Sequence, residues 1–305
     1  MTSTLVKPET SNAIYMNSGK RHDWVLLLEI TDGTLNGDPD GGNMQRIDPE
    51  TNQGLVTDVC IKRHIRNYIE AFGGEKPDPE RNNIYIKEWN VLNDIHQSAF
   101  DALGLKPDAG KKKKEREAAK EWLCNRYFDC RIFGGVLSTG DSGKYNAGQV
   151  RGPMQISFGR TYDPVLPQVF TITRLCVTNA KDEDKEKTMG NKSTIPYGLF
   201  RIYGFYNPIF GEQTEVTEQD LSLFWEALEH TWGLSRSNSK GLISPRKLIV
   251  FSHERKRGNA HAHQLFGRLN VSKINPDAAP RVYEDYKVEL NTDNLPSGIT
   301  VSELI

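Results

Sequence analysis

The stretch "NGDPDGGNMQRIDPETNQGLVTDVCIKRHIRNY", residues 36–68, joins an acidic, glycine-rich loop directly to a basic segment. Thr57 or Asp58 is placed to cap a helix that runs to Phe72, where two glycines stop it. Ahead of the loop, "WVLLLEIT" (24–31) is short, apolar and rich in strand-forming residues. We therefore predict a strand, a turn-rich loop and a helix in that order, and the loop and helix are the first place to look for a site.

The predicted helix has two different faces. Its apolar residues recur at three- and four-residue spacing and form a face that we expect to be buried: Ile61, Ile65, Tyr68, Ile69 and Phe72. The cations Lys62, Arg63 and Arg66 fall on the opposite side, which we expect to be free. Cations beside a loop whose backbone can be approached closely suit a nucleic-acid phosphate backbone, with ordinary solvated surface as the alternative.

The remaining elements predict an α+β fold. Strands are expected in "FDCRIFGGVLS", "GQVRGPMQISFGR", "TITRLCVT", "YGLFRIYGFYN", "KLIVFS" and "LFGRLNVS". An amphipathic helix from Thr217 to Trp232 opens with a capping box of Thr217 and Asp220. Strand, helix, strands, helix, strand is the order of a ferredoxin-like or RNA-recognition-like sheet, and such sheets often hold single-stranded RNA.

Two segments interrupt this order. The pattern at about residues 75–127 predicts an inserted helical lobe. The run Lys111 to Lys114 within it is most simply the solvent-exposed start of a helix. The segment "NAKDEDKEKTMGNKST" (179–194) has almost no apolar side chain, so we expect it to project as a loop or arm. The chain is thus predicted to be one domain, 1–305, with a helical insertion at about 75–127 and an arm at about 179–197.

Composition narrows the class of protein. The chain has 37% hydrophobic and 26% charged residues, no apolar run of membrane-spanning length and no secretory signal, so we expect a cytoplasmic protein with a loose N-terminal tail. Its four cysteines form no CxxC pair and are interpreted as buried reduced thiols. A net charge of −1 still permits a basic stripe, because seven Lys or Arg lie between Arg236 and Arg257 against the single Glu254.

Several candidate sites have a functional and a structural interpretation. Asp38 and Asp40 could hold a catalytic magnesium ion, or the residues around them could simply build a tight turn, which we favour. A calcium loop starting at Asp32 is disfavoured because Asn43 stands where a bidentate Glu is required.

Two further motifs are weak. "STGDSGKYN" fails as a nucleotide-binding phosphate loop, although a Gly-x-x-Gly clamp from Gly140 to Gly143, followed by Lys144, stays open. His253, His261 and His263 lie close together in the sequence, and the last two are expected on a strand. No Cys, Asp or Glu joins them at metal-ligand spacing, so we favour surface histidines over a metal site. The loop "SRSNSKG" is a better signal, because Arg236, Ser237 and Lys240 suit phosphate and 2′-hydroxyl contacts.

At these residues the sequence resembles the backbone subunit of the type I-C CRISPR interference complex (Cascade), the Cas-seven family in its Csd-two form. The resemblance lies in residues 36–69, "DCRIFGGVL", "GQVRGPMQISFGR", "TMGNKSTIPYGLFRIYGF" and "SRSNSKG…LIVFSHERKRGNAHAH", in order along nearly the whole chain. It implies a non-catalytic protein without cofactor or metal, whose RNA-recognition-like palm polymerises head to tail along a CRISPR guide RNA for antiviral defence. Each subunit would grip the RNA backbone, and its thumb arm would reach a neighbour.

The resemblance also implies residues and partners. The RNA-binding residues would be Asn36, Arg46, Lys62, Arg63, Arg66, Lys144, Lys187, Lys192, Arg236, Ser237 and Lys240. The partners would be the guide RNA, target DNA through guide pairing, other copies of the chain, a guide-processing subunit, large and small subunits, and a recruited nuclease-helicase, with no membrane. Two alternatives stay open: a metal-dependent endoribonuclease using Asp38 and Asp40, and a guide-processing enzyme using His261 or His263.

Overall fold

Strand β1 (His22–Gly33) lies at the centre of the fold in the computed structural model, which describes residues 13–138, 144–176 and 188–305. Its first nine residues are buried, and the predicted strand is confirmed. β1 pairs antiparallel with β10 (Thr188–Tyr206) along one edge and with β11 (Leu242–His253) along the other. β1 therefore sits inside the sheet, as its continuous apolar run requires.

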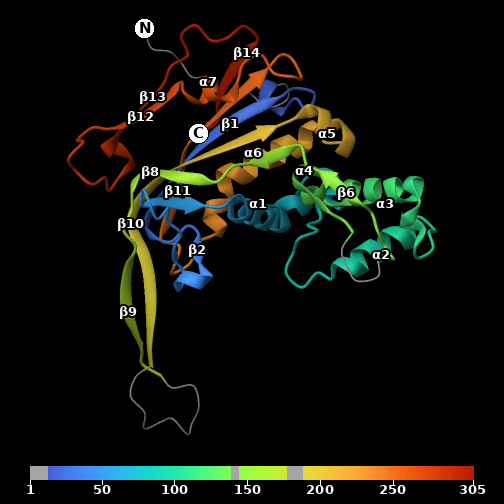
Figure 1. Cartoon of the computed structure of the whole chain (residues 1–305), viewed down its shortest axis with the longest axis horizontal. Coiled ribbons are helices and arrows are strands. Elements are labelled where there is room, and N and C mark those ends of the chain that lie inside the picture. The colour runs from blue at the N-terminus through green and yellow to red at the C-terminus, as the bar shows by residue number, and fades with distance from the viewer. Residues whose placement is uncertain (1–12, 139–143, 177–187) are drawn as a thin grey trace.

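The main sheet has eight strands and is antiparallel (Figure 1). Its order is β14-β11-β1-β10-β8-β4, while β7 and β9 pair separately with β10. These strands are β4 (Gln53–Val56), β7 (Met154–Ile156), β8 (Gly159–Pro164), β9 (Gln168–Arg174) and β14 (Ile299–Glu303). The smaller strand pairs are β2 (Gly37–Asp38) with β3 (Met44–Gln45), β5 (Gly134–Val136) with β6 (Gln149–Arg151), and β12 (Leu269–Lys273) with β13 (Tyr286–Leu290). The chain is thus a mixed α/β protein built on a central antiparallel sheet.

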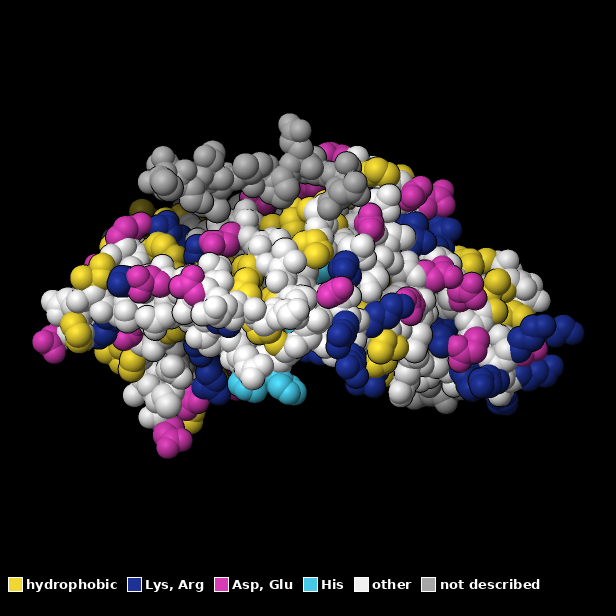
Figure 2. All heavy atoms as spheres, turned by 90° about the horizontal axis from the view of Figure 1, so that it is seen from above, with side chains coloured by type: hydrophobic (Ala, Val, Ile, Leu, Met, Phe, Trp, Pro, Cys, Tyr) yellow, Lys and Arg dark blue, Asp and Glu magenta, His cyan; other side chains and the backbone are white. Residues whose placement is uncertain are grey.

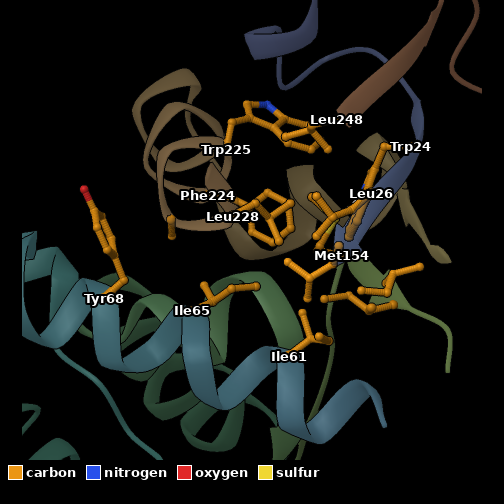
Figure 3. Close-up of a cluster of buried hydrophobic side chains, with 14 of the residues drawn as sticks. Trp24, Leu26, Ile61, Ile65, Tyr68, Met154, Phe224, Trp225, Leu228 and Leu248 are labelled. Atoms are coloured by element: carbon orange, nitrogen blue, oxygen red, sulfur yellow. Dashed lines mark hydrogen bonds between the residues drawn. The ribbon is translucent and has the colours of Figure 1, made fainter. Parts of the chain in front are cut away.

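Two helices cover one face of this sheet. α1 (Asp58–Phe72) begins at an N-cap on Thr57, and α6 (Glu218–Leu234) begins with the predicted capping box of Thr217 and Asp220. Ile61 and Ile65 of α1 point toward Phe224 of α6 and the β1 side chains (Figure 3). The predicted apolar face of α1 is therefore buried, apart from a partly exposed Phe72.

The C-terminal part of the chain covers the opposite face. α7 (Ala262–Phe266), β12 and β13 pack over a second apolar cluster. That cluster includes three aromatic side chains of the sheet and its cover, Tyr197, Phe251 and Tyr286, each at most 6% exposed. Both faces of the sheet are consequently closed to solvent at its centre.

A helical lobe extends from one end of the molecule (Figure 1). It is built from α2 (Leu92–Ala102), α3 (Lys113–Arg126) and α4 (Phe128–Phe133) around its own apolar cluster. α4 corrects the prediction of a strand at "FDCRIF", because all six residues are buried in a helix, and periodicity cannot distinguish a short buried helix from a strand. Arg131 of α4, fully buried, bonds the Asp220 carboxylate and ties the lobe to α6.

A β-hairpin projects from the other end, formed by β9 and the first part of β10 (Figure 1). All seven residues of β9 are exposed. The segment predicted to form an arm falls partly outside the described residues, since 177–187 are not described and 188–194 belong to β10.

The remaining elements are short. They are α5 (Pro208–Thr214) and the 3₁₀ turns Ile14–Met16, Pro39–Gly41, Gly73–Glu75, Pro79–Asn82, Ala109–Lys111 and Tyr283–Asp285. Among the helices of the described ranges, none combines the length and apolar character needed to cross a bilayer. The cysteine prediction holds for Cys124 and Cys130, which are buried thiols, but Cys60 is only partly buried and Cys176 is exposed.

Candidate nucleic-acid interface

Three segments far apart in the sequence meet beside the start of α1. The backbone N–H of Thr34 donates to the Ser239 carbonyl, and the Thr34 hydroxyl donates to the Ser193 carbonyl at 2.8 Å. The Lys240 ammonium donates to the Leu35 carbonyl at 2.7 Å. We call the region formed by residues 34–46, 192–194 and 235–241 the junction.

A buried glutamine holds the first of these segments. The Gln45 side chain, in a residue only 2% exposed, accepts hydrogen bonds from the N–H groups of Leu35 and Asn36 at 2.9 and 3.2 Å. Its amide nitrogen donates to the carbonyls of Leu55 and Arg46 at 2.7 and 3.0 Å. Sequence patterns gave no signal for this residue, because a single polar side chain in a polar loop has no periodicity to mark it.

Asn36, predicted to contact RNA, has a structural role in the junction. Its side-chain oxygen accepts hydrogen bonds from both the N–H and the hydroxyl of Thr57, at 2.9 and 3.0 Å. The Thr57 hydroxyl in turn accepts from the Cys60 N–H and caps α1. The loop after β1 and the start of α1 are therefore fixed to one another.

The junction also holds polar groups that the fold leaves unused. Among buried side-chain polar atoms of the described residues, Arg46 Nε and Ser193 Oγ have no hydrogen-bond partner. Another guanidinium nitrogen of Arg46 lies 3.3 Å from the Asp38 carboxylate. Nearby, the Lys192 ammonium contacts the exposed Asn238 side chain at 3.2 Å. A buried donor without a partner indicates a place where water or a ligand group completes the bonding.

The basic side of α1 is less free than predicted. The Lys62 ammonium donates to the Asp58 carboxylate at 3.0 Å. Arg66 Nε donates to the Asp129 carboxylate at 2.7 Å, and the two side chains are only 11% and 1% exposed, respectively. Both cations also lie against the Phe133 ring, 5.6 and 5.4 Å from its centroid. The prediction of a free basic face is thus wrong for two of its three cations, because this side of α1 packs against the lobe.

Arg63 alone among these three cations is exposed to solvent. On the next position of the helix, His64 is buried, with Nδ1 2.5 Å from the Ser235 hydroxyl. Burial lowers the pKa of His64 to about 4, and the nearby Lys240 charge acts in the same direction. A neutral imidazole therefore fixes α1 to the loop that carries Arg236, Ser237 and Lys240.

Other predicted RNA contacts lie elsewhere or outside the described residues. Lys144 is exposed, and its carbonyl accepts from Asp108 N–H at the edge of the lobe, away from the junction. Lys187 and the Gly140 to Gly143 motif fall outside the described ranges. Figure 2 shows Lys and Arg interspersed with Asp and Glu on the face seen there, in agreement with the weak net charge.

The acidic loop forms a tight turn in the structure. The Asp38 carboxylate accepts a hydrogen bond from the Asp40 N–H at 3.3 Å and caps a short 3₁₀ turn. The same carboxylate pairs with Arg46. Within the described ranges, no three His, Cys, Asp or Glu side chains are grouped to hold a metal ion.

The histidine prediction needs two corrections. His253 is fully buried rather than at the surface, with Nε2 3.2 Å from the Asp23 carboxylate and Nδ1 accepting the Asn259 N–H. His261 and His263 are exposed as expected, but His261 caps the helix α7, so the pair does not lie on a strand. Their rings stack with centroids 5.7 Å apart.

The fold and the junction define a class of protein: a mixed α/β chain with a cation-bearing loop cluster at the base of a projecting hairpin. Residues 20–291 match the family model described as CRISPR-associated protein Cas7, so the chain belongs to that family. A curated relative from Haloferax volcanii, "CRISPR-associated protein Cas7", is 26% identical over an alignment of 283 residues that covers 87% of this chain and 78% of the relative.

Solved structures give weaker likenesses. A chain of "CRISPR RNA-guided surveillance complex, pre-nicking" aligns over 76% of this chain and 75% of its own, with 18% identity and a TM-score of 0.48. A chain of "CRISPR RNA-guided surveillance complex" aligns over 76% and 68%, with 12% identity and a TM-score of 0.42. A chain of "Cryo-EM structure of the Type III-B Cmr-beta bound to cognate target RNA" aligns over 76% and 61%, with 16% identity and a TM-score of 0.39. These scores are too low to carry an argument about function.

Proposed function

We propose that this Cas7-family chain is a non-catalytic backbone subunit that binds a CRISPR guide RNA in a type I-C Cascade complex. The observation that carries the proposal is the junction, where Arg46 Nε and Ser193 Oγ are buried without partners beside the exposed cation Arg236. Donors of this kind, next to flexible cations, suit phosphate and 2′-hydroxyl groups. Family membership supports the assignment to CRISPR defence.

The topology supports an RNA-recognition-like palm. The neighbouring strands β11-β1-β10-β8, with α1 after β1 and α6 before β11, follow the order of a β-α-β-β-α-β sheet. The hairpin of β9 and β10 would be the base of the thumb arm at about 179–197, and the lobe would be the helical insertion at about 75–127.

The predicted contact residues divide into two groups. Exposed or unsatisfied side chains would touch RNA directly: Arg46, Arg63, Arg236 and Ser237. Lys192, half-buried and bonded to the exposed Asn238 side chain, would exchange that contact for one to RNA. Side chains already bonded within the fold would position them: Asn36, Lys62, Arg66 and Lys240. Lys144 and Lys187 stay predictions, as contacts at the lobe and on the arm.

The proposal carries the partners implied by the sequence. The chain would work in the cytoplasm, polymerise head to tail along the guide and present it to target DNA. It would assemble with the guide-processing, large and small subunits, and the complex would recruit a nuclease-helicase. Asp38 would then be structural, which agrees with its contacts to Arg46 and to the Asp40 N–H.

The first test uses protein co-expressed with a CRISPR array. Discrete co-purified RNA that survives added Mg²⁺ is the expected result. RNA that is cut in Mg²⁺ and spared in Asp38→Ala would instead place the chain among the nucleases. Preparations without any RNA would refute the proposal.

A second test concerns the junction itself. Lys192→Ala with Arg236→Ala should reduce the salt dependence of single-stranded RNA binding by about 1.4 in slope, or about 0.7 for each phosphate contact. Lys287→Ala on β13, which removes one exposed cation paired with Glu289, is the control and should leave the slope unchanged. Equal slopes in both variants would show that the junction does not bind the RNA.

A further inference from the structure

An exposed tryptophan stands on the connection between α1 and α2. Trp89 is 92% exposed, whereas Trp24, Trp225 and Trp232 are at most 3% exposed. Its backbone has φ +67°, in the left-handed region that bulky residues rarely adopt. A large aromatic side chain held in solvent by a strained backbone is typical of a binding site rather than of a core.

The connection that carries this indole is rigidly held. The Asn90 side chain donates to the carbonyls of Ile84 and Tyr85, both at 3.1 Å. The N–H groups of Tyr85 and Ile86 donate to the buried Asp129 carboxylate at 2.8 and 3.0 Å. A backbone held in this way loses little freedom when a partner covers the connection.

The surroundings of Trp89 favour a protein partner over nucleic acid. Ile86 and Val91 flank it and are 41% and 56% exposed, and we call these three residues the knob. Two exposed acids lie close to it along the chain, Glu88 and Asp94. The nearby cation Lys87 is paired with Glu70 at 2.8 Å, so the acids are in excess. Acids beside the knob would repel phosphate, so its partner should offer an apolar pocket with a basic rim.

The chain itself has a cleft that meets part of this requirement, with aromatic rings and cations in a lining that also has polar side chains. It has a volume of about 550 Å³ and is lined by Pro153, Phe205 and Phe210 together with Arg21 and Arg151. The Arg151 guanidinium lies 4.2 Å from the centroid of the Phe210 ring. Arg151 has no carboxylate partner among the described residues, whereas Arg21 is paired with Asp23.

We propose that the knob of one copy docks in this cleft of a second copy. In Figure 1 the connection between α1 and α2 hangs below α1, while α5, which carries Phe210, lies above α6. Knob and cleft are therefore on opposite sides of the molecule, and the contact is heterologous, of the kind that joins copies head to tail. The inference rests on the proposed function and names a protein contact for the head-to-tail assembly.

The test measures assembly of the full chain on a single-stranded RNA long enough for several copies, by mass photometry. Trp89→Asn removes the indole and suits the left-handed backbone. It should raise the protein concentration for half-maximal assembly by at least about 30-fold, as expected for an interface hot spot. Ile274→Asn, at a residue 67% exposed, is the control and should change it by less than about twofold.

A charge exchange tests the pairing of knob and cleft. Glu88→Arg and Arg151→Glu should each weaken assembly, and the two together should restore it. If Trp89→Asn assembles at the same protein concentration as the Ile274→Asn control, the proposed docking of the knob is wrong, while the proposed function is unaffected. Binding of a single copy to a short RNA is measured in parallel. If the unchanged chain does not bind this RNA, the proposed function is wrong. The docking of the knob is then tested by comparing self-association of the same variants at high concentration without RNA.

Discussion

Replacing Arg66 with alanine should destabilise the chain while leaving its RNA contacts in place. Arg66 lies 2.7 Å from Asp129, a carboxylate on a side chain only 1% exposed. Without the guanidinium, Asp129 keeps two hydrogen-bond donors among the described residues, the N–H groups of Tyr85 and Ile86. A buried charge that has lost its counter-ion costs about 3–5 kcal/mol, and the two remaining donors favour the lower end.

This loss of unfolding free energy can be converted into a decrease in melting temperature. At about 2.1 cal/mol/K per residue, a chain of 305 residues has an unfolding entropy of about 640 cal/mol/K. A loss of about 3 kcal/mol then lowers Tm by about 5 °C. Arg63→Ala, one turn earlier and exposed, should change stability by less than about 0.5 kcal/mol.

The assay combines thermal unfolding with RNA titrations at several salt concentrations, all well below Tm. Arg63→Ala should reduce the salt slope by about 0.7, whereas Arg66→Ala should keep the slope of the unchanged chain. Adding Asp129→Asn to Arg66→Ala should recover part of the lost stability, because the buried charge is then absent. An Arg66→Ala variant with an unchanged Tm and a lower salt slope would refute the reasoning.

Three further expectations concern the fold around the junction. Gln45→Leu should lower the urea midpoint by an amount equivalent to about 2–3 kcal/mol, because it leaves the buried N–H of Leu35 and the part-buried N–H of Asn36 unsatisfied. Because His64 has a folded pKa of about 4 and an unfolded pKa of about 6.5, the unfolded chain binds more protons between these values. Stability should therefore fall as pH drops from 6.5 to 4, and denaturation followed against pH should show a shallower fall in His64→Gln. Gly204→Ala should cost about 3 kcal/mol or more in thermal unfolding, since its Cβ would lie 2.0 Å from the Trp24 indole; Gly74→Ala, which meets nothing within 4 Å, should be close to neutral.

Local patterns predicted the elements that build the sheet and its helical cover. The apolar stripe of α1, its cap at Thr57 and the capping box of Thr217 and Asp220 are all readable from nearby residues and are confirmed. "FDCRIF" was misread, because a continuous apolar run fits a strand and a short buried helix equally well.

The candidate site could be predicted only in part, because its decisive contacts are long-range. Helical spacing places Arg66 on the polar side of α1, but its partner Asp129 is 63 residues away in the sequence. In the same way, the Leu35 carbonyl meets Lys240 across 205 residues, so composition could name the cation but not its structural use. The clustering of 34–46 with 235–241 depends on strand order, which no local pattern encodes.

The closed second face of the sheet has a consequence for guide choice. Tyr197 and Phe251 of the sheet, which could have offered flat rings to bases, are buried against Tyr286 and the rest of the C-terminal segment. An RNA held at the junction would be gripped by its sugars and phosphates at the rim, and no base would lie on these three rings. Contacts to sugars and phosphates carry no direct sequence information, so a junction that grips RNA in this way would accept guides of any sequence.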